Sequence, residues 1–477
     1  MYTIAKNVQL KIDIMNYLDK QNDFTSTQNI AENLQNATLS RSTLNKFCNE
    51  LKITIDSLYS QDELQLTVSS RHGLKLERNN TTFQPLFEQL FMSEPFYIIL
   101  KELFLKRRLN TASFCVAYQM SESKLRRRVK MLNQLLNRYR LHITVSKNIM
   151  IKGDEFQFRY FYFEFLFFIH HGLSSIPWID RPLYYLNRSR YVTQYFDYPN
   201  YGDKLDVFAL WFYINDHSNE NISLSEVKKE LIPNFQLEKP DCLDHWDRDN
   251  WDFFLSFLYS SNIFQVPLKL MEEELLLEEL TTTIDLWIDS LEKHFQQSSV
   301  LLRKIATELL QKKVVKENLF PSIPLSSTSS DDHFLEEIRL NYPRYYKIFS
   351  QFQEEVLSMD EESKLRISVK DSFLICIELI SIESVLPSVN VYFNSSHSGL
   401  KNNFNMKVIQ THFSNRVHFV WIEAFSDSDL LISTSNNINL NVDCNIETVV
   451  VNTEVNKNDL SSIERRVNKL LAERYAV

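Results

Sequence analysis

The sequence SESKLRRRVKMLNQLL, at residues 121–136, combines an apolar stripe with a strongly basic face. Its apolar residues recur at the spacing of one helix face, which predicts an amphipathic helix that Ser121 caps at its N-terminus. The stripe consists of Leu125, Val129, Leu132 and Leu136. The opposite face carries Lys124, Arg127, Lys130, Met131 and Gln134, with Arg126 and Arg128 on its two shoulders. Such a helix suits the major groove of DNA, because the groove admits a helix and phosphates attract Lys and Arg.

The segments on either side of this basic helix decide between two interpretations of it. Alone, such a helix is more often a solvated surface helix than a DNA-binding one. Upstream, however, NTASFCVAY at residues 110–118 predicts a short helix, and Gln119 and Met120 form a tight step to the basic helix. Downstream, LHITVSKNIMI at residues 141–151 alternates like a two-stranded ribbon with Lys147 at its tip. Helix, turn, basic helix and ribbon follow the order of a winged helix-turn-helix, which favours DNA binding.

The first 80 residues repeat this layout without repeating its letters. Residues 8–18, 25–34 and 40–51 predict three helices, and residues 64–77 alternate as a second wing with Arg71 at its turn. The third helix turns Leu44, Phe47, Cys48 and Leu51 inward. Its outward and flanking polar residues, which can bond base edges and phosphates, are Arg41, Ser42, Thr43, Asn45, Lys46 and Asn49. Arg71 is a further candidate DNA contact.

Charge is divided unevenly along the 477-residue chain, which is long enough for several domains. Residues 1–160 hold 23 Lys and Arg against 15 Asp and Glu, a net charge of +8. The remaining residues hold 29 basic and 46 acidic side chains, a net charge of −17, so that the whole chain carries −9. A basic N-terminal segment and an acidic remainder fit a DNA-binding region that is attached to domains with another role. The scarcity of glycine, at 5 residues, argues against glycine-rich dinucleotide-binding loops.

Cysteine usage and hydropathy indicate the compartment. Five scattered cysteines without a CxxC pair argue against a disulfide framework and favour a reducing cytoplasm. The first 18 residues carry charges that a signal peptide would lack. The most apolar run, residues 156–169, contains Arg159 and Glu164 and is too short to span a bilayer, so it predicts a buried helix. The protein is therefore expected to be cytoplasmic, without a membrane partner, and the sequence shows no metal cluster or catalytic spacing.

The rest of the chain predicts a helical part followed by a small α/β unit. Further helices are predicted at residues 205–214, 251–259, 271–294, 301–315, 334–342, 344–359 and 369–381, with a polar linker at residues 321–332. Strands are predicted at residues 389–393, 417–423, 430–434 and 448–451, and helices at residues 400–413 and 459–471. The loop NSSHSG at residues 394–399 follows the first of these strands, where such folds often hold an anion, although a simple turn is the favoured interpretation.

The two helix-turn-helix layouts and the junction IKGDEFQFR at residues 151–159 resemble the Mga/AtxA class of virulence regulators from Gram-positive bacteria. The order of parts is similar along essentially the whole chain. The resemblance implies a multidomain, mainly α protein that controls transcription, usually as an activator and as a homodimer. The implied domains are two winged helix-turn-helix domains at residues 1–80 and 81–158, two all-helical domains like the regulation domains (PRDs) of the phosphotransferase system at residues 159–275 and 276–388, and an EIIB-like α/β domain at residues 389–477.

In this class the resemblance implies control by phosphorylated histidines in the PRD-like domains, with phosphotransferase-system proteins as partners. Here Asp203 stands where the first such histidine is expected. Its carboxylate could mimic a constant negative charge or be an ordinary helix N-terminal acid. His217 and His397 are the other regulatory candidates, although His217 does not match the motif. The first loop of the EIIB-like domain reads SSHS at residues 395–398, where the EIIB domain of phosphotransferase enzymes carries a cysteine, so phosphotransfer is not expected.

The sequence therefore predicts a transcription regulator, not an enzyme, that binds double-stranded DNA without a cofactor. In the second winged helix the predicted contacts are Lys124, Arg126, Arg127, Arg128, Lys130 and Lys147. Two alternatives belong to other classes of protein. The missing cysteine argues against a phosphotransferase-system component. The helical beginning of the chain argues against a PRD-containing RNA-binding antiterminator, because such proteins open with a small β-rich module.

Overall fold

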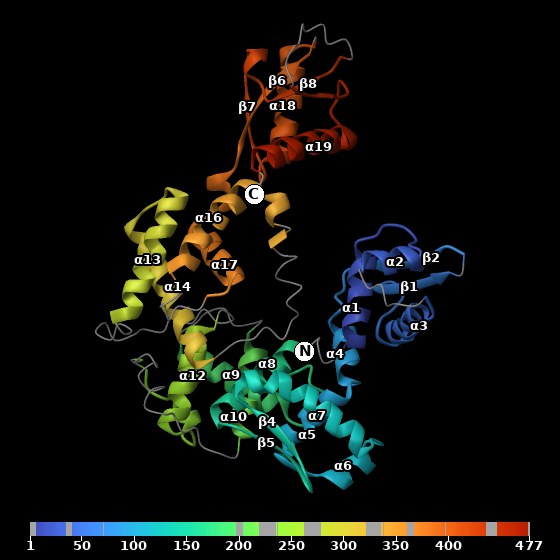
Figure 1. Ribbon diagram of the computed structural model, residues 1–477, viewed down its shortest axis with the longest axis vertical. Helices are drawn as coiled ribbons and strands as arrows, with labels where there is room; N and C mark the ends of the chain where they lie inside the picture. The colour runs from blue at the N-terminus through green and yellow to red at the C-terminus, as the bar shows by residue number, and fades with distance from the viewer. Residues whose placement is uncertain are drawn as a thin grey trace. The chain divides into compact units, whose positions relative to one another are not determined.

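The computed structural model divides the chain into two compact units. It describes residues 6–34, 41–69, 71–196, 204–218, 235, 237–261, 278–320, 335–336, 338–359, 367–395, 397–435 and 446–475. The first compact unit comprises Met1–Glu274 with Val315–Ser327, and the second comprises Leu275–Val314 with Thr328–Val477. Figure 1 shows the ribbon of both units and labels most of their helices and strands.

The N-terminal winged helix opens the first compact unit. Its elements are α1 (Lys6–Asp19), α2 (Thr27–Asn33), α3 (Arg41–Leu58), β1 (Leu64–Ser69) and β2 (Gly73–Arg78). Ser26 caps α2 by accepting a hydrogen bond from the Asn29 amide at 3.1 Å. Helix α3 runs seven residues beyond the predicted end at residue 51, because Ile55 continues its buried stripe. The wing turns at Gly73, whose φ of +98° and close approach to the Thr25 carbonyl leave no room for a Cβ.

The second winged helix follows directly in the chain. Its elements are α4 (Gln84–Met92), α5 (Pro95–Lys106), β3 (Arg108–Asn110), α6 (Thr111–Ala117), α7 (Glu122–Leu136), the 3-10 turn η1 (Asn137–Tyr139), β4 (His142–Val145) and β5 (Asn148–Lys152). The predicted two-stranded ribbon is confirmed as β4 and β5, which pair antiparallel. Strand β3 adds to the other edge of β5, so the wing has three strands. Three residues are too few to show alternation, which explains why the sequence did not predict β3.

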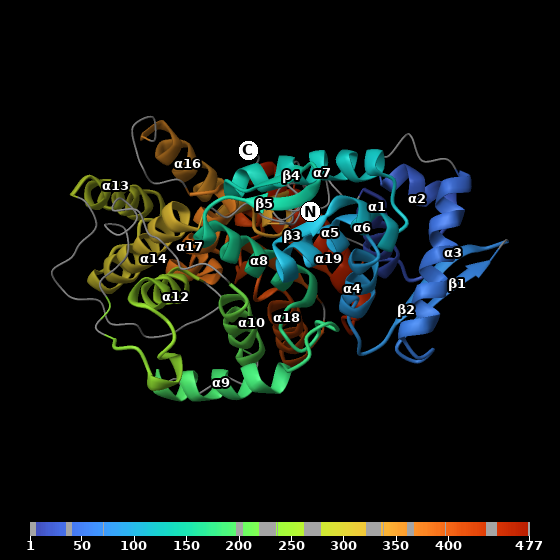
Figure 2. The ribbon, with the colours of Figure 1, turned by 90° about the horizontal axis from the view of Figure 1, so that it is seen from below.

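A helical part completes the first compact unit. It contains α8 (Glu155–His170), α9 (Pro182–Tyr195), α10 (Leu205–Asp216), η2 (Asp241–Leu243) and α12 (Arg248–Ser260). Helix α8 is buried on nearly all sides, which confirms the predicted buried helix. In Figure 2, α9 lies at the lower edge of the view, against the end of α10. The sequence did not predict α9, because its outer face carries apolar and aromatic residues that blur the periodicity: Leu183, Tyr184, Tyr191 and Tyr195.

A buried histidine lies where α8 meets α5. His170 is 1 % exposed, and its Nε2 lies 2.8 Å from the Tyr97 hydroxyl, which also accepts a 2.9 Å hydrogen bond from the Trp178 indole. The Nδ1 atom of His170 has no hydrogen-bond partner among the described residues, since the nearest carboxylate oxygen, on Glu88, is 4.0 Å away. Burial lowers the pKa of His170 from 6.5 to about 4, and His171 lowers it further.

The first compact unit should therefore lose stability in mild acid. As the pH falls below 6.5, an exposed histidine in the unfolded chain takes up a proton that folded His170 does not accept until about pH 4. Stability from this residue is thus complete above pH 6.5 and decreases by about 3 kcal/mol between there and pH 4. Urea unfolding of the wild type and of His170→Gln at pH 7.5 and pH 4.5 measures the difference. An equal pH dependence in both proteins would contradict this assignment.

The second compact unit begins with helices. They are α13 (Glu278–Phe295), the first part of α14 (Val300–Leu319), α16 (Pro343–Met359) and α17 (Val369–Leu379), followed by the turn η3 (Ile382–Val385). They enclose a core in which Trp287 meets Phe352 edge-on and Tyr345 meets Phe373 in the same way. The predicted helices at residues 301–315, 344–359 and 369–381 are confirmed. The polar linker at residues 321–332 lies outside the described residues.

The C-terminal part of the second unit is a small α/β sheet, as predicted. Its elements are β6 (Ser388–Asn394), α18 (Gly399–Phe413), β7 (His418–Trp421), η4 (Phe425–Asp427), β8 (Leu430–Ser433), β9 (Glu447–Val450) and α19 (Lys457–Arg474). The strands are all parallel and lie in the order β7-β6-β8-β9. Both α18 and α19 contribute to a single core with the sheet, through residues such as Ile409 and Ile463. In the part of the chain that the structure describes, no helix has the length and apolar character needed to cross a membrane.

Candidate nucleic-acid interface

Helix α7 has the structure that its sequence predicts. The Ser121 hydroxyl accepts a hydrogen bond from the Lys124 amide at 3.3 Å and so caps the helix. Its inner face is buried: Leu125, Val129, Leu132, Leu135 and Leu136. This face packs against α5, α6 and β4. The helix is therefore held from behind by apolar contacts, which leaves its other face to solvent.

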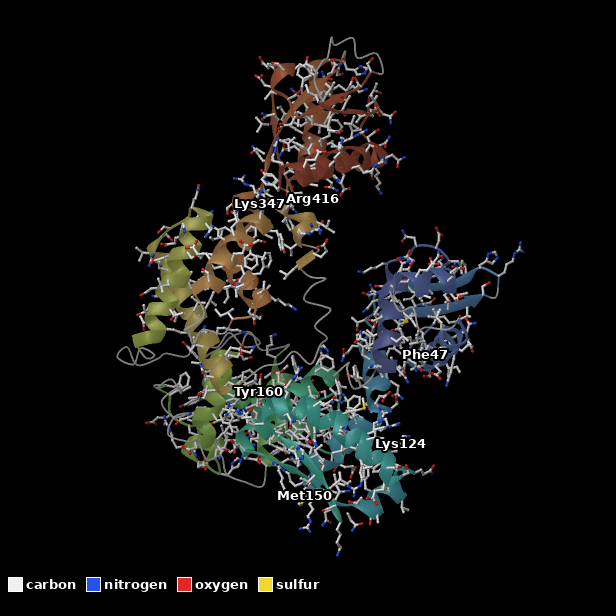
Figure 3. The ribbon with its side chains drawn as sticks, in the orientation of Figure 1. Phe47, Lys124, Met150, Tyr160, Lys347 and Arg416 are labelled. Carbon is white, nitrogen blue, oxygen red and sulfur yellow. The ribbon has the colours of Figure 1, made fainter. Side chains whose placement is uncertain are left out.

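The outer face of α7 is cationic. Lys124, Arg127, Lys130 and Gln134 are exposed. Within the described residues, none of the three cations on this face forms a salt bridge. Met131, which the sequence placed on this face, is instead half-buried against the core. Figure 3 labels Lys124 on α7 and Met150 on the wing. Three charges on one helix face that form no salt bridge among the described residues suit a polyanion.

The two shoulder arginines of α7 differ from Arg127. The Arg126 guanidinium donates to Glu122 Oε1 at 2.6 Å and to the Val145 carbonyl at 3.0 Å. It therefore links the helix to the edge of the wing while remaining half exposed. Arg128 is half-buried, and its Nε has no hydrogen-bond partner among the described residues. Arg127 is exposed, and the described residues offer its side chain no hydrogen bond or salt bridge.

The wing is fastened to both helices of the helix-turn-helix. The Asn133 amide on α7 donates to the Ile143 carbonyl at 2.9 Å and accepts from the Ile143 amide at 2.7 Å, so it satisfies the free edge of β4. At the start of α6, Thr111 donates its hydroxyl to the Ser146 carbonyl and its amide to the Lys147 carbonyl. Lys147 is exposed at the wing turn, as predicted. These bonds fix the wing tip relative to α7.

A buried carboxylate holds α6 against α5. Glu102 is 7 % exposed and accepts hydrogen bonds from the Tyr118 hydroxyl at 2.8 Å and from Lys106 at 2.7 Å. Burial acts to raise the pKa of Glu102, but these two bonds and the charges of Lys106 and Lys101 together hold the pKa below its usual value. Burial together with Glu102 raises the pKa of Tyr118 to about 12. The end of α6, and hence the turn into α7, is anchored by this contact.

Tyr118→Phe is expected to lower the free energy of unfolding of the first compact unit by about 1–2 kcal/mol. The substitution keeps the ring, which packs on Phe114 at 4.8 Å between centroids, but removes a hydrogen bond to a charged acceptor. Urea denaturation followed by tryptophan fluorescence measures the change. Tyr184→Phe on the exposed face of α9 is the matched control, with no expected effect. Equal stability of the two variants would show that the Glu102 contact does not anchor α6.

The N-terminal winged helix presents a less basic surface. Ser42, Asn45 and Lys46 are exposed on α3, whereas Thr43 is half-buried. Lys46 lies 3.9 Å from the Glu50 carboxylate. The structure describes the backbone of Arg41, where α3 begins, but not its side chain. The predicted contact Arg71 is exposed at the wing turn.

The candidate regulatory residues belong to other segments of the chain. Asp203 lies outside the described residues. His217 ends α10 and packs its ring 4.0 Å from that of Tyr213. His397 lies in the loop before α18, where its amide donates to the Ser395 hydroxyl at 3.2 Å. The described residues contain no group of three His, Cys, Asp or Glu side chains placed to hold a metal ion.

Strand pairing reveals a row of wing residues that sequence reasoning missed. In an antiparallel pair, residues directly opposite one another point to the same face of the sheet. His142 is opposite Lys152, and Met150 is opposite both Arg108 and Thr144. The inner face is apolar, through Ile143, Ile149 and Leu109. The outer face therefore carries the basic residues Arg108, His142 and Lys152. The alternation of residues 141–151 contained this signal for His142 and, continued by one residue, for Lys152. The pairing with β3, which adds Arg108, is not local in the sequence.

Comparison with known proteins bears on this domain. No curated protein matches the chain. Residues 76–166 match the family model of the Mga helix-turn-helix domain, a span that contains all of the second winged helix from α4 to β5. A match to this helix-turn-helix domain suggests a DNA-binding transcription regulator. The match confirms the resemblance seen in the sequence and supports the membership of the chain in the Mga-like regulator family, whose helix-turn-helix domain it carries.

Proposed function

We propose that the protein regulates transcription by placing α7 in the major groove of duplex DNA, with the N-terminal winged helix making a second, weaker contact. The observation that carries this proposal is the face of Lys124, Arg127 and Lys130, which is exposed and forms no salt bridge within the described residues. The buried leucines behind it keep the helix rigid, so little conformational entropy is lost when DNA binds. The exposure of Lys147 at the wing tip supports a contact of this residue with a phosphate beside the groove.

Binding of a labelled 30-base-pair duplex, followed by fluorescence anisotropy at several salt concentrations, tests this function. We expect binding that weakens steeply with salt, because each neutralised phosphate releases counterions. A hairpin RNA of equal length is the comparison. Tighter binding to the hairpin RNA than to the duplex would replace this proposal by the RNA-binding antiterminator. The absence of binding to either nucleic acid would contradict both.

The remaining parts of the chain are proposed to be regulatory. The all-helical stretches support two PRD-like domains at residues 159–275 and 276–388, and the four parallel strands support an EIIB-like domain at residues 389–477. Activation and homodimer formation are proposed from the family likeness. Phosphotransferase-system proteins are proposed partners, although the loop at residues 395–398 has no cysteine to carry a phosphoryl group. Sedimentation velocity tests the dimer, and a monomer at every concentration would contradict it.

A further inference from the structure

A groove lies between α7 and strand β4, beside the face that is proposed to enter DNA. Its volume is about 420 Å³. It is lined by Arg126, Val129, Lys130, Asn133, Gln134, Asn137, His142 and Val145. Among these described residues two are permanently cationic, three are amides, one is histidine and none is a carboxylate. A groove of this composition is suited to an anionic, hydrogen-bond-accepting occupant.

Two of the lining residues form fixed walls. Asn133 uses both ends of its amide on the Ile143 backbone, and Arg126 is held by Glu122 and the Val145 carbonyl. Neither side chain can therefore swing across the groove without breaking these bonds. The width of the groove is set by the packing of α7 along the free edge of β4. The site is thus formed before any ligand arrives.

The side chains of the other polar lining residues can donate hydrogen bonds to a ligand. Within the described part of the chain, the side chains of Lys130, Gln134, Asn137 and His142 make no hydrogen bond or salt bridge to another residue. Lys130 and Gln134 also belong to the exposed face of α7, so the groove is continuous with that face. At the other rim His142 leads to Lys152, its partner across the wing. A strip of donors therefore runs from α7 across the groove to the wing.

We infer that this groove seats the sugar–phosphate backbone of one DNA strand, the strand that borders the major groove occupied by α7. This inference rests on the proposed function. Phosphate oxygens accept hydrogen bonds from amides and Lys, and such contacts fix the register of a protein on DNA without reading its sequence. The groove assigns to Gln134 and Asn137 the role of backbone contacts and leaves Lys124 and Arg127 to the major groove.

The double variant Gln134→Ala/Asn137→Ala tests the assignment in the full-length protein. It removes two neutral donors, so affinity for duplex DNA is expected to fall about tenfold while the slope of log affinity against log salt stays unchanged. The loss of affinity should be equal for duplexes of different sequence. In ethylation interference, some phosphates whose ethylation blocks binding of the wild type should no longer affect binding of the double variant. Lys124→Ala/Arg127→Ala should instead reduce the salt slope by about two. Asn187→Ala/Gln194→Ala, which removes the same residue types from the exposed face of α9, is the control.

The outcomes separate the groove from the proposed function. If Gln134→Ala/Asn137→Ala binds like the wild type while Lys124→Ala/Arg127→Ala is weakened, the groove assignment is overturned and DNA binding stands. A loss confined to one DNA sequence would also overturn it, because it would show base reading. Failure of the wild type to bind any duplex would overturn the proposed function itself. Gln134→Glu, which places a carboxylate against the phosphates, should weaken binding more than Gln134→Ala, and melting curves check that each variant is folded.

Discussion

Replacing Lys124, Arg127 and Lys130 together by alanine is expected to weaken binding to duplex DNA by about 1000-fold. In the proposed complex each exposed cation on α7 neutralises one phosphate or bonds a base edge, and about tenfold in affinity is expected from each. The salt slope should fall by about three, one for each charge removed. The buried stripe of α7 is untouched, so the free energy of unfolding should change little.

The control for this triple variant removes three cations from elsewhere in the first compact unit. Arg181, Arg190 and Arg248 are exposed and lie outside both winged helices. Their replacement by alanine lowers the net charge by the same amount, so it corrects for long-range attraction. Fluorescence anisotropy over a range of salt concentrations measures both variants. If the two lose affinity equally, overall charge and not the face of α7 governs binding.

Arg159→Met is expected to cause the largest loss of stability in the first compact unit, about 3 kcal/mol. Arg159 is 3 % exposed and donates to Glu155 Oε1 at 3.2 Å and to the Asn215 side chain at 2.8 Å; it also bonds Asn250. Removing it takes one of two cationic partners from the buried Glu155 carboxylate and one donor from each of two buried amide oxygens, so part of their desolvation is no longer compensated. Arg107 still donates to Glu155 at 2.8 Å, which places the expected loss at the low end for a buried pair.

The same cluster joins the second winged helix to the helical part behind it. Arg107 precedes β3 and Glu155 follows β5, so both ends of the wing sheet meet in this cluster. Burial raises the pKa of Glu155, and the charges of Arg107 and Arg159 oppose that rise. Glu155→Gln/Arg159→Met also removes the charge of the buried Glu155 carboxylate and should be more stable than Arg159→Met alone. Urea denaturation of the two variants measures this difference, and equal stabilities would show that the carboxylate was never dependent on Arg159.

Local pattern was sufficient for the basic helix and for the order of the elements around it. The spacing from Leu125 to Leu136 determines which face of α7 is buried, because every turn of a helix brings residues three and four apart to the same side. Ser121 determines where the helix starts for an equally local reason, a hydrogen bond to a backbone amide three residues on. The parallel sheet near the C-terminus was also predictable as a sequence of short strands and helices.

Only the tertiary structure decided what each basic residue does. Arg126 and Arg127 are neighbours in the sequence, yet Arg126 donates a hydrogen bond to the Val145 carbonyl of the wing and Arg127 has no bonding partner among the described residues. The groove beside α7 depends on Asn133 meeting Ile143, and the buried cluster joins Arg159 to Asn250, 91 residues along the chain. Periodicity indicates which side of a helix or strand is buried. The hydrogen bonds of Arg126, Asn133 and Arg159 depend instead on which other element packs against that side. That choice is made by the packing of the whole core, so no window of the sequence contains it.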